Sequence, residues 1–297
     1  MGESNLEIFK YLVTDYLSEL SLELNCSGLI INSFEYSCFP GKKFVKDEIS
    51  NILKSIRNSG KAVILNCDRI IHENEINLYK EYLLSLINEV DYIIYSDYSI
   101  LTLVDGKYYD KLIYDPKTLV CSYNELNTLD TKAFISSEIS MDELSEIVYN
   151  AEPEKLCINA FGYHQIMYSK RNLISLYNSH LGSNLLSKET IYDLKEEQRE
   201  DLYKIVENDR GTFIYTHFIY ALLENLNIIK DKVFMFRINS FLLDSDSVEY
   251  IINKYNNLIF EKDLEKQKDI VKEINLKFPS AKPGFLKDEL YLLKNKN

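Results

Sequence analysis

KLCINAFGYHQIMYSKRNLISLY, residues 155–177, joins a short apolar run to a polar segment and then to an amphipathic one. The run 155–159 follows the turn signal Glu152-Pro153 and has the length and composition of a buried strand. From Leu173 onward the apolar residues suit a helix. In α/β proteins the carboxyl end of a strand is where chemistry is placed. The polar segment between them is therefore either a functional segment or a plain connection between a strand and a helix.

The same alternation of strand and helix extends over residues 27–160. Apolar runs predict strands at 29–31, 62–66, 91–95, 112–114 and 133–136, and amphipathic runs predict helices at 44–58, 73–88, 99–104, 123–129 and 141–150. Strands buried on both faces and separated by helices indicate a parallel sheet. No GxGxxG fingerprint or P-loop follows any of these strands. We therefore predict an α/β protein with a TIM-like (β/α) barrel rather than an open doubly wound sheet.

Two regions break this rhythm. Residues 6–24 are predicted to form an amphipathic helix with no clear strand before it, so the barrel is either incomplete or begins with a disguised strand. Residues 205–215 hold two apolar runs around the turn 208–211, NDRG, which predicts a β-hairpin.

After this hairpin we predict a helix at 219–229, a strand at 233–238, a helix at 247–255 and a charged helix at 261–274. The predicted division is a barrel from 1–184 and 219–260, a β-hairpin insertion at 185–218, and a C-terminal helix and tail at 261–297.

Composition narrows the possible functions. The net charge is −12 and the isoelectric point about 5.0, whereas a protein that grips a phosphate backbone with its whole surface should be basic. We expect a cytoplasmic protein, because the sequence shows neither a signal-peptide pattern nor an apolar run long enough to span a bilayer. The five cysteines are scattered without a CxxC pair, and the four histidines lack metal-ligand spacing, so no metal site is predicted. The GxSxG motif of serine hydrolases is also absent.

The ends of the predicted strands carry most of the candidate chemistry. Carboxyl ends of barrel strands point to the active face, although strand ends are also polar simply because they meet solvent. The polar groups at these ends are Asn32, Asn66, Asp97, Asp115, Glu138, the segment 161–171 and Asn239.

Specific roles can be assigned within this set. Glu138 closes an apolar strand and could act as a general base or hold an amine or a ribose hydroxyl, and His164 could serve as an acid or a base. Lys170 and Arg171 lie near a predicted helix start and could clamp a carboxylate or a phosphate. We predict Glu138 and His164 as catalytic residues. The predicted substrate-binding residues are Asn66, Asp97, Tyr168, Ser169, Lys170, Arg171 and Glu207.

Several segments, taken in order, resemble the collagenase-like peptidase U-32 family. Residues 161–177 are similar to its signature region, which in short Firmicute-type members reads as a glycine-containing strand end followed by SKRxLL. LIYDPKTLVCSYNEL at 112–126 resembles YDxxTLVTS…N, FISSEISMDELSEI at 134–147 resembles vLaREltxeELkeI, and YKIVENDRGTFI at 203–214 resembles YxIxEDxHGTHI. Shorter matches lie at 61–66 and 91–97. The resemblance covers residues 27–255.

The resemblance implies a TIM-like barrel with a smaller inserted module. Members were first described as collagenases, and others take part in hydroxylating RNA bases, including the wobble uridine of tRNA, where prephenate is implicated. Many hold an iron–sulfur cluster through four cysteines. Here Gln165 and Asn172 stand where the first two of these would be, and no cysteine follows Cys157. The resemblance therefore implies a divergent member, and we predict no cofactor.

Three functions remain open. The first is prephenate-dependent tRNA wobble-uridine hydroxylation, as enzyme or subunit, with Glu138, Lys170 and Arg171 binding an anionic donor or RNA. The second is a collagenase-like peptidase. The third is a non-catalytic partner of a cluster-bearing paralogue. The expected partners are a longer family paralogue, tRNA and a small anionic donor such as prephenate, with no membrane and no DNA.

Overall fold

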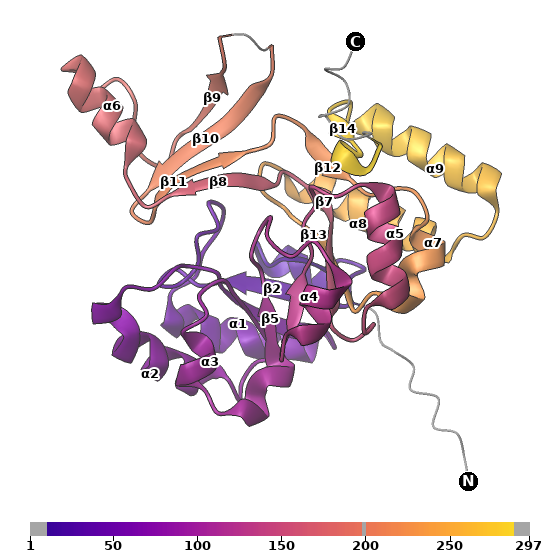
Figure 1. The fold of residues 1–297 in the computed structure, drawn as a ribbon, viewed down its shortest axis with the longest axis horizontal. Helices are drawn as coiled ribbons and strands as arrows, with labels where there is room; N and C mark the ends of the chain where they lie inside the picture. The colour runs from indigo at the N-terminus through magenta and orange to yellow at the C-terminus, as the bar shows by residue number, and fades with distance from the viewer. Residues whose placement is uncertain (1–10, 198–199, 288–297) are drawn as a thin grey trace.

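A computed structural model describes residues 11–197 and 200–287, and its centre is a closed parallel barrel (Figure 1). The barrel strands of the described chain are β1 (Tyr11–Asp15), β2 (Gly28–Asn32), β3 (Ala62–Cys67), β4 (Tyr92–Tyr95), β5 (Leu112–Tyr114), β6 (Lys132–Phe134), β7 (Leu156–Gly162) and β13 (Met235–Ile238). Strand β13 pairs in parallel with both β1 and β7, which closes the barrel. The predicted TIM-like fold is confirmed, and the barrel is complete.

The first barrel strand was disguised, and the helix predicted over 6–24 is wrong for its described part. Residues 11–15 form β1, and only the short 3₁₀ helix η1 (Glu19–Glu23) follows. The strand is buried on both faces from Leu12 to Asp15, so it lacks the alternation that marks a half-buried strand. Thr14 donates a hydrogen bond of 2.9 Å from Oγ1 to the Ile238 carbonyl. Residues 6–10 lie outside the described part.

Helices surround the barrel (Figure 1). They are α1 (Lys46–Asn58), α2 (Ile76–Leu86), α3 (Ile100–Leu103), α4 (Tyr123–Thr128), α5 (Met141–Asn150), α7 (Leu226–Ile229) and α8 (Ser245–Phe260), with α9 (Leu264–Lys277) against α8. Short 3₁₀ helices add η2 (Glu73–Glu75), η3 (Gly106–Lys111), η4 (Lys230–Lys232) and η5 (Gly284–Lys287).

The helix predicted over 219–229 is wrong in its first half. Residues 219–221 form β12 (Ile219–Ala221), which pairs antiparallel with the end of β7 and in parallel with β14 (Ala281–Lys282). All three side chains of β12 are buried, and a run buried on both faces cannot be assigned to a helix or a strand by periodicity. Only α7 remains helical, after Asn225 in the left-handed conformation with φ of 62°.

A second, antiparallel sheet lies over one end of the barrel (Figure 1). Its described strands run in the order β8 (Gln165–Ser169), β11 (Gly211–Tyr215), β10 (Leu202–Asn208) and β9 (Ile191–Lys195), and α6 (Leu173–Leu181) follows β8. The predicted hairpin around 208–211 joins β10 to β11. Gly211 has φ of 132°, and a Cβ there would overlap the Ser169 carbonyl. The sheet begins at Gln165, upstream of the insertion predicted to start at 185.

The second sheet is held to the barrel mouth by an apolar cluster. Val206, Phe213 and Tyr215 of the sheet pack on Cys38 and Phe39, which follow β2, and on Phe241, which follows β13. The ring centroids of Tyr215 and Phe241 are 4.4 Å apart. This packing leaves a covered space between the sheet and the barrel.

The barrel lumen changes from apolar to polar along each strand. The lower layer is Val13, Ile30, Ile64, Ile94, Ile113, Phe134, Cys157 and Met235. Two residues further along the same strands stand Asp15, Asn32, Asn66, Ser96, Asp115, Ser136, Asn159 and Arg237. Residues two apart on a strand share a face, so these polar groups lie above the apolar layer at the carboxyl end. The lumen is therefore filled by apolar side chains below and lined by polar side chains at its carboxyl-terminal end.

Candidate site at the barrel mouth

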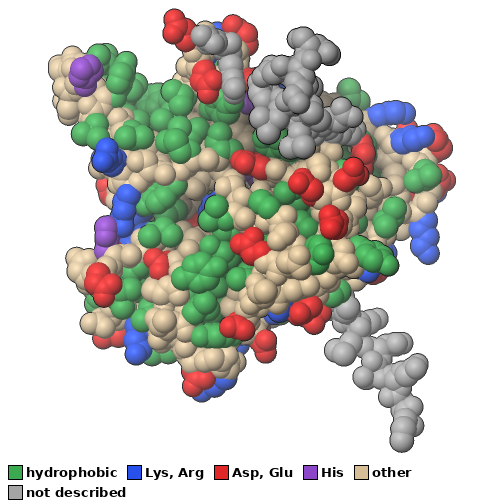
Figure 2. Space-filling model, in the orientation of Figure 1, with side chains coloured by type: hydrophobic (Ala, Val, Ile, Leu, Met, Phe, Trp, Pro, Cys, Tyr) green, Lys and Arg blue, Asp and Glu red, His purple; other side chains and the backbone are tan. Residues whose placement is uncertain are grey.

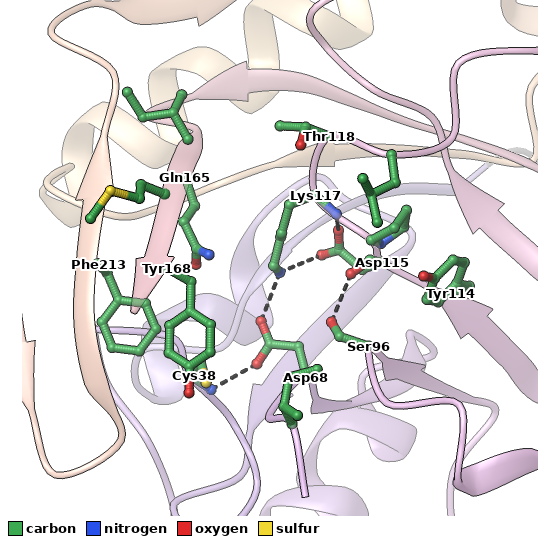
Figure 3. A pocket seen from close by; sticks show the side chains of 15 residues that line it. Cys38, Asp68, Ser96, Tyr114, Asp115, Lys117, Thr118, Gln165, Tyr168 and Phe213 are labelled. Carbon is green, nitrogen blue, oxygen red and sulfur yellow. Dashed lines mark hydrogen bonds and ion pairs between the residues drawn. The ribbon is translucent and has the colours of Figure 1, made fainter. Parts of the chain in front are cut away.

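A cavity of about 290 Å³ lies between the barrel mouth and strands β8 and β11 (Figure 3). A second, smaller space of about 40 Å³ continues it toward the lumen. We call them the outer chamber and the inner chamber. They share Asp68, Asp115, Lys117 and Gln165 as lining residues. Carboxyl ends of barrel strands are the usual location of active sites in this fold.

Four charged side chains form an alternating chain at the junction of the two chambers. Lys117 donates hydrogen bonds of 2.8 Å from Nζ to Asp68 and to Asp115 (Figure 3). Arg237 donates from Nη1 to the same Asp115 oxygen at 3.0 Å. Asp68, Asp115 and Arg237 are nearly inaccessible to solvent. Buried charges are tolerated where they are paired in this way.

The ionisation of this chain follows from its pairing. Burial alone would raise the pKa of Asp68, but Lys117 outweighs it and lowers the pKa to about 2. Burial also opposes ionisation of Asp115, whose pKa is nevertheless lowered by Lys117 and Arg237. The two carboxylates in turn raise the pKa of Lys117 against the effect of burial. All four groups are therefore charged at neutral pH, and they sum to zero.

A hydrogen-bond network connects Asp68 to the lumen. Asp68 accepts from the Ser37 hydroxyl at 3.0 Å and from the Cys38 backbone at 2.8 Å. Asn66 donates to Ser37 and to Asn32, and Asn32 donates to Asp15 at 2.9 Å. Asp15, the last residue of this network, is also held from β13's side, because the backbone N–H and the hydroxyl of Ser240 both donate to its carboxylate. The mouth is therefore a rigid, preorganised polar surface.

His164 lies in the connection from β7 to β8 and lines the inner chamber. Its Nδ1 is 2.6 Å from the hydroxyl of Ser137, and its ring lies on Tyr220 with centroids 4.5 Å apart. Burial, reinforced by the positive charge of Arg237, lowers the pKa of His164 to about 3. The imidazole is therefore neutral at physiological pH.

Two buried nitrogen atoms of inner-chamber residues lack a partner among the described residues. They are Nε2 of His164 and Nε of Arg237. The guanidinium Nε–H can only donate. Buried polar groups are normally satisfied, so an unpartnered pair lining one chamber indicates a place for a ligand atom.

The outer chamber has apolar and aromatic walls. Tyr168 is stacked on Phe213 with ring centroids 5.1 Å apart, and its hydroxyl donates to the Arg210 carbonyl. The other side is formed by residues 116–119 and by Tyr114 (Figure 3). Such a chamber suits a flat or ring-shaped apolar body above a charged base.

The structure brings to the mouth three of the residues that were predicted as catalytic or substrate-binding. His164 lines the inner chamber and Tyr168 the outer one. Asn66 is buried in the network below them. Glu138 is exposed and lines neither chamber, although its neighbour Ser137 does. The catalytic roles predicted for Glu138 and His164 stay predictions.

The remaining predicted residues lie outside the two chambers. Asp97 accepts from the backbone of Ile71 at 2.7 Å and of Ser99 at 2.9 Å, so its carboxylate holds two loops. Lys170 and Arg171 are exposed just after β8, where Ser169 accepts from the Arg171 backbone.

Glu207 belongs to β10, and its fully buried side chain lies against the first turn of α6. It accepts from the backbone of Ile174 and Ser175, and from the Ser175 hydroxyl. It thus supplies the cap that Asn172 does not.

Asp68, Lys117 and Arg237 belong to the site but were not among the residues predicted from the sequence. A signal was present for each. Asp68 comes directly after β3, and Lys117 follows the strand-end pair Asp115-Pro116. Arg237 stands inside an apolar strand, MFRI, where an unpaired charge would be costly. Their mutual pairing could not be read from the sequence, because 122 positions separate Arg237 from Asp115.

The cysteines do not fit an iron–sulfur cluster. All five are free and lie on separate segments: Cys38, Cys67 and Cys157 are buried, Cys26 is half-buried and Cys121 is exposed. Within residues 11–197 and 200–287, no group of three His, Cys, Asp or Glu side chains is placed to hold a metal ion. Over the same residues, no helix combines the length and apolarity needed to cross a bilayer.

Together, the fold and the mouth define a (β/α) barrel protein with a covered polar site at the carboxyl ends of its strands. The sequence matches the profile of peptidase family U32 over residues 33–291. The chain belongs to this family.

The solved structures that match the chain are distant from it in sequence. The U32 peptidase Mk0906 has a TM-score of 0.47 and 12% identity, with 78% of this chain and 92% of that chain covered. The C-terminal domain of a putative chitinase from Desulfitobacterium hafniense has a TM-score of 0.42 and 8% identity, with 84% and 99% covered. No curated protein matches the sequence.

Proposed function

We propose that the barrel mouth binds a small carboxylate-bearing molecule, and that the protein serves prephenate-dependent hydroxylation of the tRNA wobble uridine as an enzyme or a subunit. The observation that carries the proposal is the pair of buried, unpartnered nitrogens at the inner chamber, Nε2 of His164 and Nε of Arg237. A carboxylate oxygen accepts from Arg237 Nε–H, and also from His164 Nε2 when that atom carries the ring proton, and so offsets the cost of leaving these groups unpaired.

The rest of the mouth supports a carboxylate attached to an apolar body. Asp68 and Asp115 already accept from Lys117, and Asp115 also from Arg237. The Nε–H of Arg237 and the third N–H of Lys117 remain available as cationic donors. Above them, Tyr168 and Phe213 offer an apolar wall for a ring. Prephenate has a six-membered ring with one carboxylate bonded to it and a second on a side chain, so its ring suits the apolar wall and a carboxylate suits the charged base.

RNA binding would have to be local. The net charge of −12 opposes contact over the whole surface, and Figure 2 shows acidic side chains scattered over the visible face of the barrel. Lys170 and Arg171 are exposed beside the second sheet and are the pair we assign to phosphate contacts. A partner subunit that supplies further basic residues is compatible with this arrangement.

A peptidase is less well supported by the chemistry of the mouth. Burial and the nearby Asp68 raise the pKa of Cys38 to about 12, so this thiol is not a thiolate nucleophile. Ser137 contacts His164, but a base with a pKa of about 3 is weak, and no described carboxylate bonds its other nitrogen. The third function, a non-catalytic partner, needs no nucleophile and stays compatible with the site.

Mass spectrometry of bulk tRNA tests the proposal directly. The gene is deleted in a strain without other members of the family, and the 5-hydroxyuridine-type nucleosides are measured. We expect them to be lost, and to return with the wild-type gene but not with Tyr168→Ala. A charge-changing control on the exposed face of α2, Lys80→Ala, should restore them fully.

Unchanged modification after deletion would refute the tRNA function. Cleavage of gelatin by the purified protein, lost in Glu138→Gln, would favour the peptidase. Copurification with a longer, cysteine-bearing family member, together with unchanged modification, would favour the partner role.

A further inference from the structure

We propose that Ser137 is a positioning residue that holds His164 in the neutral Nε2–H tautomer, so that His164 binds ligand as a hydrogen-bond donor and not as an acid or a base. The inference rests on the proposed function only in that the inner chamber accepts an anionic oxygen atom.

Hydrogen bonds of the His164 backbone and packing of its ring hold this residue in one orientation. Its N–H donates to the Thr216 hydroxyl at 3.2 Å, and the Thr216 N–H donates back to its carbonyl at 2.9 Å. The ring is packed on Tyr220, and the side chain is nine-tenths buried. The direction of each ring nitrogen is therefore fixed by the fold. Only the position of the proton remains to be set.

Ser137 sets that proton. Its hydroxyl is 2.6 Å from Nδ1, within the range of an O–H···N hydrogen bond. A hydroxyl that donates to Nδ1 requires a lone pair there, which places the ring proton on Nε2. The opposite arrangement would put a lone pair on Nε2. Such a lone pair would repel the anionic oxygen atom that the proposed function places in this chamber, and no described residue donates to Nε2.

The charges facing the ring disfavour a doubly protonated imidazole. Arg237 comes from β13 and Lys117 from the segment after β5, and both repel a cation. Asp115 attracts one, but it is already engaged by these two residues, as Asp68 is by Lys117. The remaining titratable neighbours, Tyr215 and Tyr220, are buried phenols with raised pKa values. Two donors, His164 Nε2–H and Arg237 Nε–H, therefore belong to residues that line the same chamber.

Nitrogen-15 NMR of the full-length protein tests the tautomer without any substrate. The chain has four histidines, and the exposed His72 and His180 serve as reference signals in the spectrum. We expect His164 to show a protonated Nε2 and an unprotonated Nδ1, unchanged between about pH 8 and about pH 5. Ser137→Ala should give a mixture of tautomers, whereas Ser137→Thr, which keeps the hydroxyl, should preserve the wild-type pattern.

A proton on Nδ1 in the wild type, a His164 titration above about pH 5, or an unchanged tautomer in Ser137→Ala would overturn the inference. The tRNA assay adds a second readout. His164→Gln keeps an N–H donor and should retain at least about a tenth of the modification, a loss of at most about 1.4 kcal/mol, whereas His164→Leu should abolish it. Equal loss in both variants would show that the ring acts as an acid or a base. Failure of the tRNA function itself would leave the NMR result interpretable.

Discussion

Asp115 is the residue on which the buried charges depend. It accepts from Lys117 at 2.8 Å and from Arg237 at 3.0 Å while only 1% of its side chain is exposed. Lys117 has a second carboxylate in Asp68, but Arg237 has no other ion pair among the described residues. Removing the Asp115 charge would therefore leave a buried guanidinium without its carboxylate.

We predict that Asp115→Asn lowers the free energy of unfolding by about 3–5 kcal/mol, the usual cost of breaking a buried pair. Urea denaturation measures it. The matched control is Asp209→Asn, which removes an exposed ion pair to Lys188 at 3.1 Å and should cost at most about 1 kcal/mol. Equal losses in the two variants would contradict the role given to Asp115.

At the scale of elements, α6 depends on a residue of another strand for its start. Its first turn lacks a side-chain cap from Asn172, and Glu207 of β10 accepts from the Ile174 and Ser175 backbones. A carboxylate at this end also interacts favourably with the helix dipole. The helix is therefore attached to the second sheet through one buried side chain.

Glu207→Ala is predicted to destabilise α6 selectively, because it leaves two backbone N–H groups without a partner. We expect a loss of about 1–3 kcal/mol. Hydrogen exchange should become faster in α6 while the barrel strands β2 and β3 stay protected. Glu200→Ala, on a side chain that is 95% exposed in its pair with Lys195, is the control and should leave exchange unchanged. Loss of protection throughout the barrel would argue against a local role.

At the scale of the whole molecule, stability should fall on acidification. His164 has a pKa lowered by burial from 6.5 to about 3, so the unfolded chain binds its proton first. The contribution of His164 to the free energy of unfolding is therefore at its full value above about pH 6.5, and it is lost as the pH falls toward about 3. Asp68, with its pKa lowered from 3.8 to about 2, adds to the loss only below about pH 4.

We therefore expect the free energy of unfolding to drop by about 3 kcal/mol between pH 6.5 and about pH 4 from His164 alone. Urea denaturation at several pH values measures the slope. In His164→Gln the drop in the free energy of unfolding over this pH range should be smaller by about 3 kcal/mol. The exposed control His180→Gln should show the same drop as the wild type. Parallel slopes in wild type and His164→Gln would exclude a buried neutral imidazole.

Local patterns were sufficient for the fold class and for much of the strand framework. An apolar run such as AVILN at 62–66 predicts a buried strand without knowledge of which strands pair with it. The NDRG turn predicts a hairpin from the backbone preferences of its own residues. The strands at 11–15 and 219–221 were missed because both faces of each are covered, which removes the alternation that distinguishes a strand from a helix.

The sequence by itself determined the barrel, the polar ends of its strands and the presence of His164 and Tyr168 near them. Only the tertiary structure decided which polar residues meet. Asp68 follows β3, Asp115 and Lys117 follow β5, and Arg237 lies within β13, while Ser137 reaches His164 across 27 positions. Barrel closure and the second sheet exclude water from these groups, and burial then dictates their pairing. Ion pairs and hydrogen bonds between side chains so far apart in the chain cannot be predicted from any local stretch of sequence.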